Sequence, residues 1–211
     1  MPELQKLYDA VLNGDAKAAA AVTQAALAEG AEPAMLVAQY MIPAMTEAGR
    51  LFEAEEYFVP ELLLSARAMK AAMGPVRPRL AAGSGPLGGR VVIGTVKGDL
   101  HDIGKNLVAA MLEGGGFEVI DLGTNVSPEE FLQAASEKQA NLIALSALLT
   151  VTMPAMRTTI EFLRQAGIRN RLKVIVGGAP VTRQFAEEIG ADGYGESAPA
   201  AVALARRLLA V

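Results

Sequence analysis

The pattern of apolar and polar positions changes near residue 90. Residues 3–73 favour helix throughout, because they are rich in Ala, Leu, Met and Glu, with Gly14, Gly30 and Pro33 marking turns or helix starts. Four short helices fit this segment and suggest a bundle. They are predicted at 3–12, 15–28, 33–51 and 56–73.

From residue 90 onward, short apolar runs alternate with segments of helical spacing. Five strand–helix units predict an α/β fold, a flavodoxin-like, doubly wound, parallel five-stranded sheet. The strands are predicted at 90–96, 117–122, 141–146, 172–176 and 191–194, and the helices at 103–113, 128–138, 153–166, 181–189 and 198–209. If the strand order is 2-1-3-4-5, the loops after the first and third strands line a crevice.

Residues 74–89 separate these two patterns. They contain five glycines and three prolines in sixteen residues, a composition that breaks helices and buries little apolar surface. We therefore expect a helical domain at 1–73, a linker at 74–89 and an α/β domain at 90–211.

Composition narrows the function classes. The 211 residues are 52% hydrophobic and 20% charged, and the net charge of −4 is spread evenly, so no basic patch suggests nucleic acid or an anionic membrane. The absence of cysteine excludes disulfides, thiolate metal sites and cysteine nucleophiles. The first residues lack the pattern of a signal peptide and no apolar run reaches membrane-spanning length, so we expect a cytoplasmic protein.

The loop after the first predicted strand holds the only histidine. Asp99, His101 and Gly104 form an Asp-x-His-x-x-Gly stretch at the carboxyl end of the strand Val91 to Val96, the edge where open α/β sheets bind ligands. A carboxylate two residues before an imidazole can accept the hydrogen of one ring nitrogen while the other nitrogen binds a metal ion. In a simpler interpretation, Asp99 caps the following helix and His101 packs at its start.

The segment from Gly94 to Asn106 resembles the signature of the cobalamin-binding domain shared by methionine synthase and the small corrinoid proteins of methyltransferase systems. Residues 146–152 are similar to the second loop of that family, and residues 174–179 to its third loop. Residues 50–70 are similar to the helical module that covers the corrin. The resemblance covers nearly the whole chain, with the blocks in the order of the family.

The resemblance implies a cobalamin or related corrinoid whose lower axial cobalt ligand is His101. It also implies a proton relay of Asp99, His101 and Thr152, where the family often has serine at the position of Thr152. Protonation of this relay should weaken the cobalt–imidazole bond.

Further cofactor contacts are implied around the displaced nucleotide tail. In an alternative interpretation, Ser146 is an ordinary residue at the end of a strand. Gly177 and Gly178 can likewise simply turn the chain out of the fourth strand. The implied contacts are Gly98, Asp102, Ile103, Gly104, Ser146, Leu148, Thr150, Gly177 and Gly178.

In the helical domain, Phe52, Val59 and Leu62 match positions that cover the upper face of the corrin in the family. A dry apolar lid would protect Co(I), a strong nucleophile. Apolar residues on one helix face can equally be core residues.

The function implied by the resemblance is that of a methyl carrier. Cobalt would alternate between Co(I) and methylcobalamin, in which it is Co(III), while a substrate-specific corrinoid methyltransferase loads the methyl group and an acceptor methyltransferase removes it. A reductive activator is a further expected partner, and the linker is the expected hinge. The carrier itself would make and break no substrate bond.

Four alternatives belong to other classes. A corrinoid storage or delivery protein stays open. A cobalamin-dependent sensor is disfavoured, because such sensors usually add a DNA-binding domain and their photoreceptors use a tryptophan that this chain lacks. A mutase subunit is disfavoured because mutases cover the corrin with a large barrel, whereas a short helical segment precedes the α/β domain here. A phosphate-binding loop fits poorly, because the spacing from Gly98 to Gly104 is one residue too long and Asn106 stands where Ser or Thr must reach magnesium.

Overall fold

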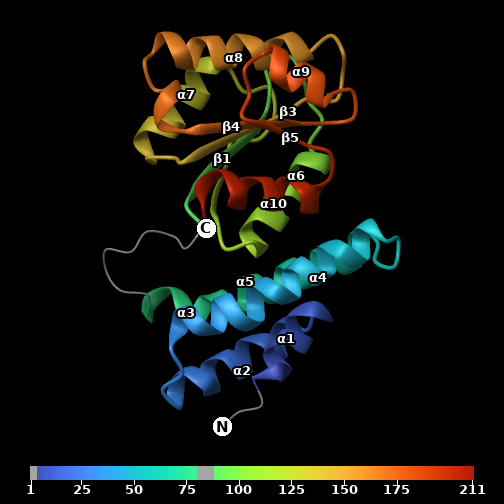
Figure 1. Ribbon diagram of the computed structural model, residues 1–211, viewed down its shortest axis with the longest axis vertical. Coiled ribbons are helices and arrows are strands. Elements are labelled where there is room, and N and C mark those ends of the chain that lie inside the picture. Colours follow the sequence, from blue (N-terminus) through green and yellow to red (C-terminus); the bar gives the residue numbers. More distant parts are fainter. Residues whose placement is uncertain (1–3, 80–87) are drawn as a thin grey trace. The chain divides into compact units, whose positions relative to one another are not determined.

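The computed structural model describes residues 4–79 and 88–211 (Figure 1). The chain divides into two compact units, one of residues 1–85 with 113–116 and one of residues 86–112 with 117–211. In the described parts of the chain, no helix is both long enough and apolar enough to span a membrane.

The first unit is helical, as predicted. Its helices α1, α2, α4 and α5 contact one another, and they bury apolar side chains such as Leu7, Val11 and Leu27. The elements are α1 (Gln5–Leu12), α2 (Ala16–Ala28), α3 (Pro33–Leu36), the π-helical turn η1 (Val37–Met41), α4 (Ile42–Glu53), α5 (Val59–Val76) and the 3-10 turn η2 (Arg77–Arg79).

The predicted helix 33–51 contains a π turn that the sequence analysis did not anticipate. Within it, the backbone N–H of Ile42 donates to the carbonyl of Val37, five residues earlier. The next residue is Pro43, which has no N–H and whose ring would clash with the carbonyl four residues earlier in a regular α-helix. The wider turn relieves that conflict, which explains why it lies here.

Helix α5 also extends beyond its predicted end at residue 73. It continues through Gly74 and Pro75 to Val76, although these residue types disfavour helix. Met73 and Val76 are buried, so packing outweighs a weak local propensity. The predicted linker therefore begins within a helix, and its residues 80–87 lie outside the described part of the chain.

The second unit is a parallel five-stranded sheet in the order β2-β1-β3-β4-β5, which confirms the predicted fold class and strand order. Figure 1 shows helices α7, α8 and α9 on one face of this sheet and helices α6 and α10 on the other. The strands are β1 (Arg90–Thr95), β2 (Glu118–Asp121), β3 (Leu142–Ser146), β4 (Lys173–Gly177) and β5 (Gly193–Gly195). The helices are α6 (Ile103–Gly114), α7 (Pro128–Glu137), α8 (Met153–Gln165), the 3-10 turn η3 (Arg169–Arg171), α9 (Arg183–Glu188) and α10 (Ala198–Leu209).

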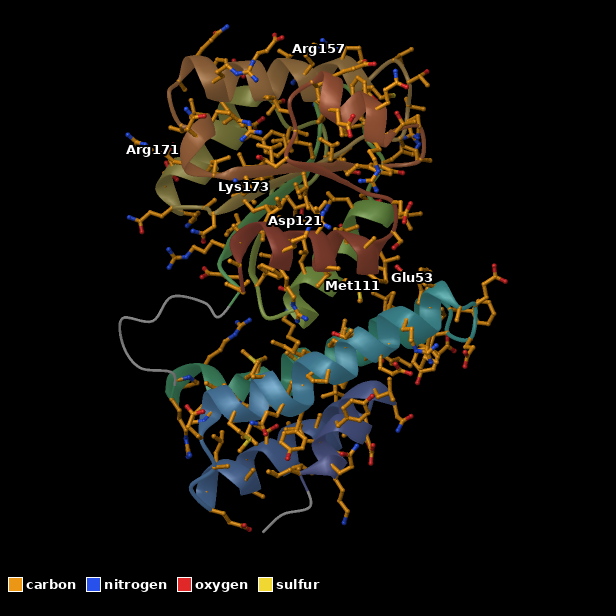
Figure 2. The ribbon with its side chains drawn as sticks, viewed as in Figure 1. Glu53, Met111, Asp121, Arg157, Arg171 and Lys173 are labelled. Carbon is orange, nitrogen blue, oxygen red and sulfur yellow. The ribbon has the colours of Figure 1, made fainter. Side chains whose placement is uncertain are left out.

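The register of the sheet brings three loops to one edge. Thr95 at the end of β1 pairs with Ser146 at the end of β3, and Ser146 pairs with Gly177 at the end of β4. The opposite edge is marked by Lys173, which begins β4 and is labelled in Figure 2. The loops after β1, β3 and β4 therefore emerge together at the carboxyl edge, at the switch point of the topology.

Candidate functional site

The loop between β1 and α6 holds His101 against a buried carboxylate. Oδ1 of Asp99 lies 2.9 Å from Nδ1 of His101 and accepts the backbone N–H of the same residue at 3.1 Å. Asp99 is fully buried, whereas 51% of the His101 side chain is exposed. Because Nδ1 is held by an acceptor, its hydrogen stays there and Nε2 keeps the lone pair that a metal ion requires.

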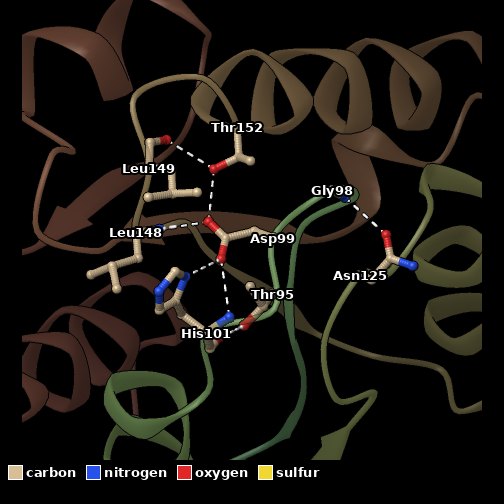
Figure 3. A network of polar contacts seen from close by, with 8 residues as sticks. All are labelled: Thr95, Gly98, Asp99, His101, Asn125, Leu148, Leu149 and Thr152. Carbon is tan, nitrogen blue, oxygen red and sulfur yellow. Dashed lines mark hydrogen bonds and ion pairs between the residues drawn. The ribbon is translucent and has the colours of Figure 1, made fainter.

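The second oxygen of Asp99 binds the loop after β3. Oδ2 accepts the N–H of Leu148 at 2.8 Å and the hydroxyl of Thr152 at 2.7 Å (Figure 3). Burial alone would raise the pKa of Asp99, but the hydrogen bonds from Leu148, Thr152 and His101 outweigh it and hold this pKa well below its usual range. An ionised carboxylate thus joins the first and second loops.

Thr152 ends this chain of hydrogen bonds. Its hydroxyl lies 2.7 Å from Asp99 Oδ2 and 2.8 Å from the carbonyl oxygen of Leu149. A hydroxyl carries one hydrogen, so Thr152 can donate to only one of these acceptors at a time. Charge favours the carboxylate while Asp99 is ionised.

Large apolar side chains are exposed in the same two loops. The exposed fractions are 42% to 86% for Leu100 in the first loop, Ile103 at the start of α6, and Leu148, Leu149 and Val151 in the second loop. Apolar side chains gathered at the mouth of a sheet are typical of a ligand surface. The sequence analysis named Ile103 and Leu148 but missed Leu100, Leu149 and Val151, whose apolar character within loops was the available signal.

The predicted glycines of the site differ in what an added side chain would meet. A Cβ on Gly178, which has a φ of +128°, would lie 1.9 Å from the carbonyl oxygen of Ala147, and one on Gly177 would lie 3.0 Å from that of Gly195. Packing against the loop after β3 thus requires glycine at position 178, and at position 177 a side chain would make a tight contact with β5. A Cβ on Gly104 would meet nothing within 4 Å, so the protein leaves open space there that an inserted ligand can use.

Other predicted contact residues lie at the same edge. Asp102 is exposed and accepts a hydrogen bond from the Asn106 amide at 3.1 Å. Ser146 is half-buried at the end of β3, and Thr150 is exposed in the following loop. Gly98 has a φ of +84°, a conformation that favours glycine.

The three apolar residues of the helical unit have different environments. Phe52 is partly buried near the end of α4, and Val59, the first residue of α5, is 41% exposed. Leu62 is fully buried, which fits the alternative interpretation of this residue as core.

Two polar residues near His101 were missed by the sequence analysis. Thr95 is buried, and its hydroxyl donates to the carbonyl of His101 at 2.7 Å. Asn125 lies between β2 and α7, and its side chain accepts the N–H of Gly98 at 2.9 Å. A hydroxyl at the end of an apolar strand was a signal for Thr95, but nothing in the local pattern singled out Asn125.

The whole arrangement fits a corrinoid. His101 would offer one imidazole nitrogen to the metal of such a cofactor, and the exposed apolar side chains of the two loops would suit an apolar ring. A B12 binding domain model matches residues 89–203, and a second model of the same description matches residues 3–76.

Known corrinoid proteins are similar over the full length of the chain. A dimethylamine corrinoid protein of Methanosarcina barkeri is 41% identical over 208 residues, which cover 98% of this chain and 97% of the relative. A trimethylamine corrinoid protein of Methanosarcina acetivorans is 42% identical over 208 residues, covering 98% of this chain and 96% of the relative.

Solved structures of cobalamin-binding proteins are also similar to this chain. A cobalamin-binding protein from Desulfitobacterium hafniense has a TM-score of 0.83 and 32% identity, with 99% of both chains covered. A chain of the methanol:cobalamin methyltransferase complex from Methanosarcina barkeri has a TM-score of 0.83 and 31% identity, with 99% of this chain and 80% of that chain covered. This chain therefore belongs to the B12-binding corrinoid proteins, and it is a cobalamin-binding methyl carrier of a methyltransferase system.

Proposed function

We propose that this protein passes a methyl group between two partner methyltransferases, and that His101 is the lower axial ligand of its cobalt. The observation that carries the assignment of His101 is a half-exposed imidazole among exposed apolar side chains, with one nitrogen held by a fully buried carboxylate. The bound corrinoid supplies the metal centre on which a methyl group can be carried.

The residues around His101 prepare its ring for the metal. Asp99 keeps the hydrogen on Nδ1, and Leu148 and Thr152 keep Asp99 in place and ionised through bonds of 2.8 and 2.7 Å. The lone pair on Nε2 of His101 is therefore left for a metal ion.

The apolar loops have a separate role. Leu100 and Ile103, close to His101 in sequence, and Val151, next to Thr152, expose their side chains. We propose that they pack against the lower face of the corrin and exclude water from the cobalt–imidazole bond, which strengthens it. Phe52 and Val59 stay candidates for contacts to the upper face, on the resemblance alone.

The comparisons support one of the three proposed partners. One solved relative is part of a methanol:cobalamin methyltransferase complex, which supports a substrate methyltransferase as the first partner. An acceptor methyltransferase and a reductive activator complete the proposal, since a carrier must be unloaded and its cofactor kept reduced. Identities of 41% and 42% to the dimethylamine and trimethylamine relatives do not separate these donors, so we assign the choice of donor to the first partner.

Reconstitution with cobalamin tests the ligand. We expect one cobalamin per chain, with the nucleotide base off cobalt and nitrogen coupling from His101 in the paramagnetic resonance spectrum of the Co(II) form. His101→Ala should lose that coupling. A spectrum in which the nucleotide base stays on cobalt would refute the assignment.

A transfer assay tests the carrier role. Protein loaded with isotopically labelled methylcobalamin is mixed with candidate methyltransferases, including those that serve the dimethylamine, trimethylamine and methanol relatives. Loss of label from the protein only in the presence of one of them supports the proposal. Tight binding of cobalamin without transfer to any of them would indicate a storage or delivery protein instead.

A further inference from the structure

Asn125 clamps the segment that carries the carboxylate of the site. It lies in the connection between β2 and α7, far from Asp99 in sequence. Its side-chain oxygen accepts the N–H of Gly98 at 2.9 Å, and its own N–H donates to the carbonyl of Asp99 at 2.9 Å. Figure 3 shows the first of these bonds beside the Asp99 network. The two bonds hold both ends of the Gly98–Asp99 unit.

The clamp is itself anchored to β1. The N–H of Thr95 donates to the carbonyl of Gly123 at 2.9 Å, and the N–H of Val126 donates to the carbonyl of Thr95 at 2.9 Å. Asn125 therefore lies between two backbone bonds to the same strand residue. Its position is set by the sheet and does not depend on a bound ligand.

The backbone of Asn125 is in an unusual conformation. Its φ is +56°, in the left-handed region that costs energy for residues with a side chain and that Asn tolerates better than most. Glycine would adopt this conformation with less strain but could not accept the bond from Gly98. A side chain kept in such a conformation at a site requires a compensating contact, and the bond to Gly98 provides one.

We infer that Asn125 is a positioning residue for the cobalt ligand, acting through Asp99. Gly98 has a φ of +84° and, as a glycine, many alternative conformations. Holding the Gly98–Asp99 unit restricts these alternatives and keeps the carboxylate between His101 on one side and Leu148 with Thr152 on the other. The inference rests on the proposed role of His101.

Amide hydrogen exchange of the cofactor-free protein, followed by NMR, separates this role from a local one. In Asn125→Gly the Gly98 amide loses its acceptor directly. If the clamp holds Asp99, the amides of His101 and Leu148, whose acceptors are the two Asp99 oxygens, should also exchange about fivefold faster, the factor that corresponds to one hydrogen bond of about 1 kcal/mol. Faster exchange at Gly98 alone would overturn the inference.

Two variants provide the controls. Asn125→Asp keeps an acceptor oxygen and tolerance of positive φ, and it should restore exchange close to that of the parent protein. Gln139→Gly changes another left-handed residue, with a φ of +52°, in the connection between α7 and β3 away from the site. It should leave the amides of His101 and Leu148 unchanged, and an equal acceleration there would show a nonspecific effect of glycine and contradict the role of Asn125.

The cobalamin-loaded protein gives the second measurement. In Asn125→Gly the ratio of histidine-ligated to unligated cobalt should fall by about the same factor, while Asn125→Asp keeps the ratio of the parent protein. An unchanged ratio in Asn125→Gly would overturn the positioning role. A parent protein without histidine ligation would instead overturn the proposed ligand role of His101. The exchange experiment would then still show whether Asn125 holds Asp99.

Discussion

Replacing Asp99 by Asn tests the centre of the site, because it keeps the shape of the side chain and removes its charge. Asp99 is fully buried and accepts four hydrogen bonds, from the N–H and ring of His101, the N–H of Leu148 and the hydroxyl of Thr152. Asparagine offers one oxygen and one NH₂ group at the same positions. The NH₂ group must therefore face either the two donors of His101 or the donors of Leu148 and Thr152.

The structure indicates which arrangement costs less. If the amide oxygen faces His101, the NH₂ group can donate to Thr152, whose hydroxyl then donates to the carbonyl of Leu149 at 2.8 Å. Only the N–H of Leu148 is left without an acceptor, at a cost of about 1–3 kcal/mol. The loss of charge weakens the remaining bonds further, so we expect Asp99→Asn to lower the free energy of unfolding by about 2–4 kcal/mol.

Urea unfolding of the cofactor-free protein measures this cost. Asp102→Asn is a matched control for stability, because Asp102 is an exposed carboxylate with one bond, from Asn106 at 3.1 Å. It should lose less than about 0.5 kcal/mol. If Asp99→Asn and Asp102→Asn unfold at the same urea concentration, the reasoning about the buried carboxylate is wrong.

The same variant has a defined pH dependence. Hydrogen bonds hold the pKa of Asp99 in the folded protein below its usual range, despite its burial. Its stabilising contribution is therefore complete above the ordinary carboxylate pKa of about 3.9 and is lost as the pH falls from there towards the folded pKa. The difference in stability between the parent protein and Asp99→Asn should shrink on acidification, and in the cobalamin-loaded variant His101 should stay on cobalt with an altered pH dependence.

Three further predictions concern single side chains. His101→Ala should still bind cobalamin, because an inserted nucleotide tail would contribute more contact than one axial bond. Absorbance should lack the imidazole signature, and complete loss of binding would contradict this prediction. Thr152→Val should cost about 1.5–3 kcal/mol in urea unfolding, since a buried carboxylate loses a hydroxyl donor, whereas Thr152→Ser should retain most of that stability. Phe52→Ala should accelerate photolysis of bound methylcobalamin without changing the imidazole spectrum, and because Phe52 is partly exposed it should cost less than the ~3–5 kcal/mol of a fully buried ring; an unchanged photolysis rate would leave Phe52 as a core residue.

The strands and their order were predictable because the physical signals are local. The apolar run Val91 to Val96 is buried, and alternating strands and helices admit few topologies. The loop of His101 could therefore be assigned to the carboxyl edge from the pattern alone. The pattern also predicted that the loop of His101 lies beside the loop of Thr152, because the ends of β1 and β3 are neighbours in the sheet.

The contacts between loops were less predictable because they depend on register and backbone conformation. Asn125 reaches Gly98 only because its φ is +56° and because Val126 pairs beyond the end of β2. Neither feature leaves a mark in the spacing of apolar residues. Likewise, only the structure shows that Gly178 is required by the carbonyl of Ala147, whereas Gly104 leaves open space.

The Asp99 network also bears on how the cofactor binds. The bond from His101 to Asp99, the two bonds from the loop after β3 and the clamp of Asn125 are all formed by the protein itself. These bonds favour one tautomer and one direction of the imidazole, and the cost of ordering these groups belongs to folding. A preorganised ligand loses less entropy on binding, so substitutions that loosen the loop should lower the share of histidine-ligated cobalt more than they lower the uptake of cobalamin. That difference separates residues that position His101 from residues that would only contact the cofactor.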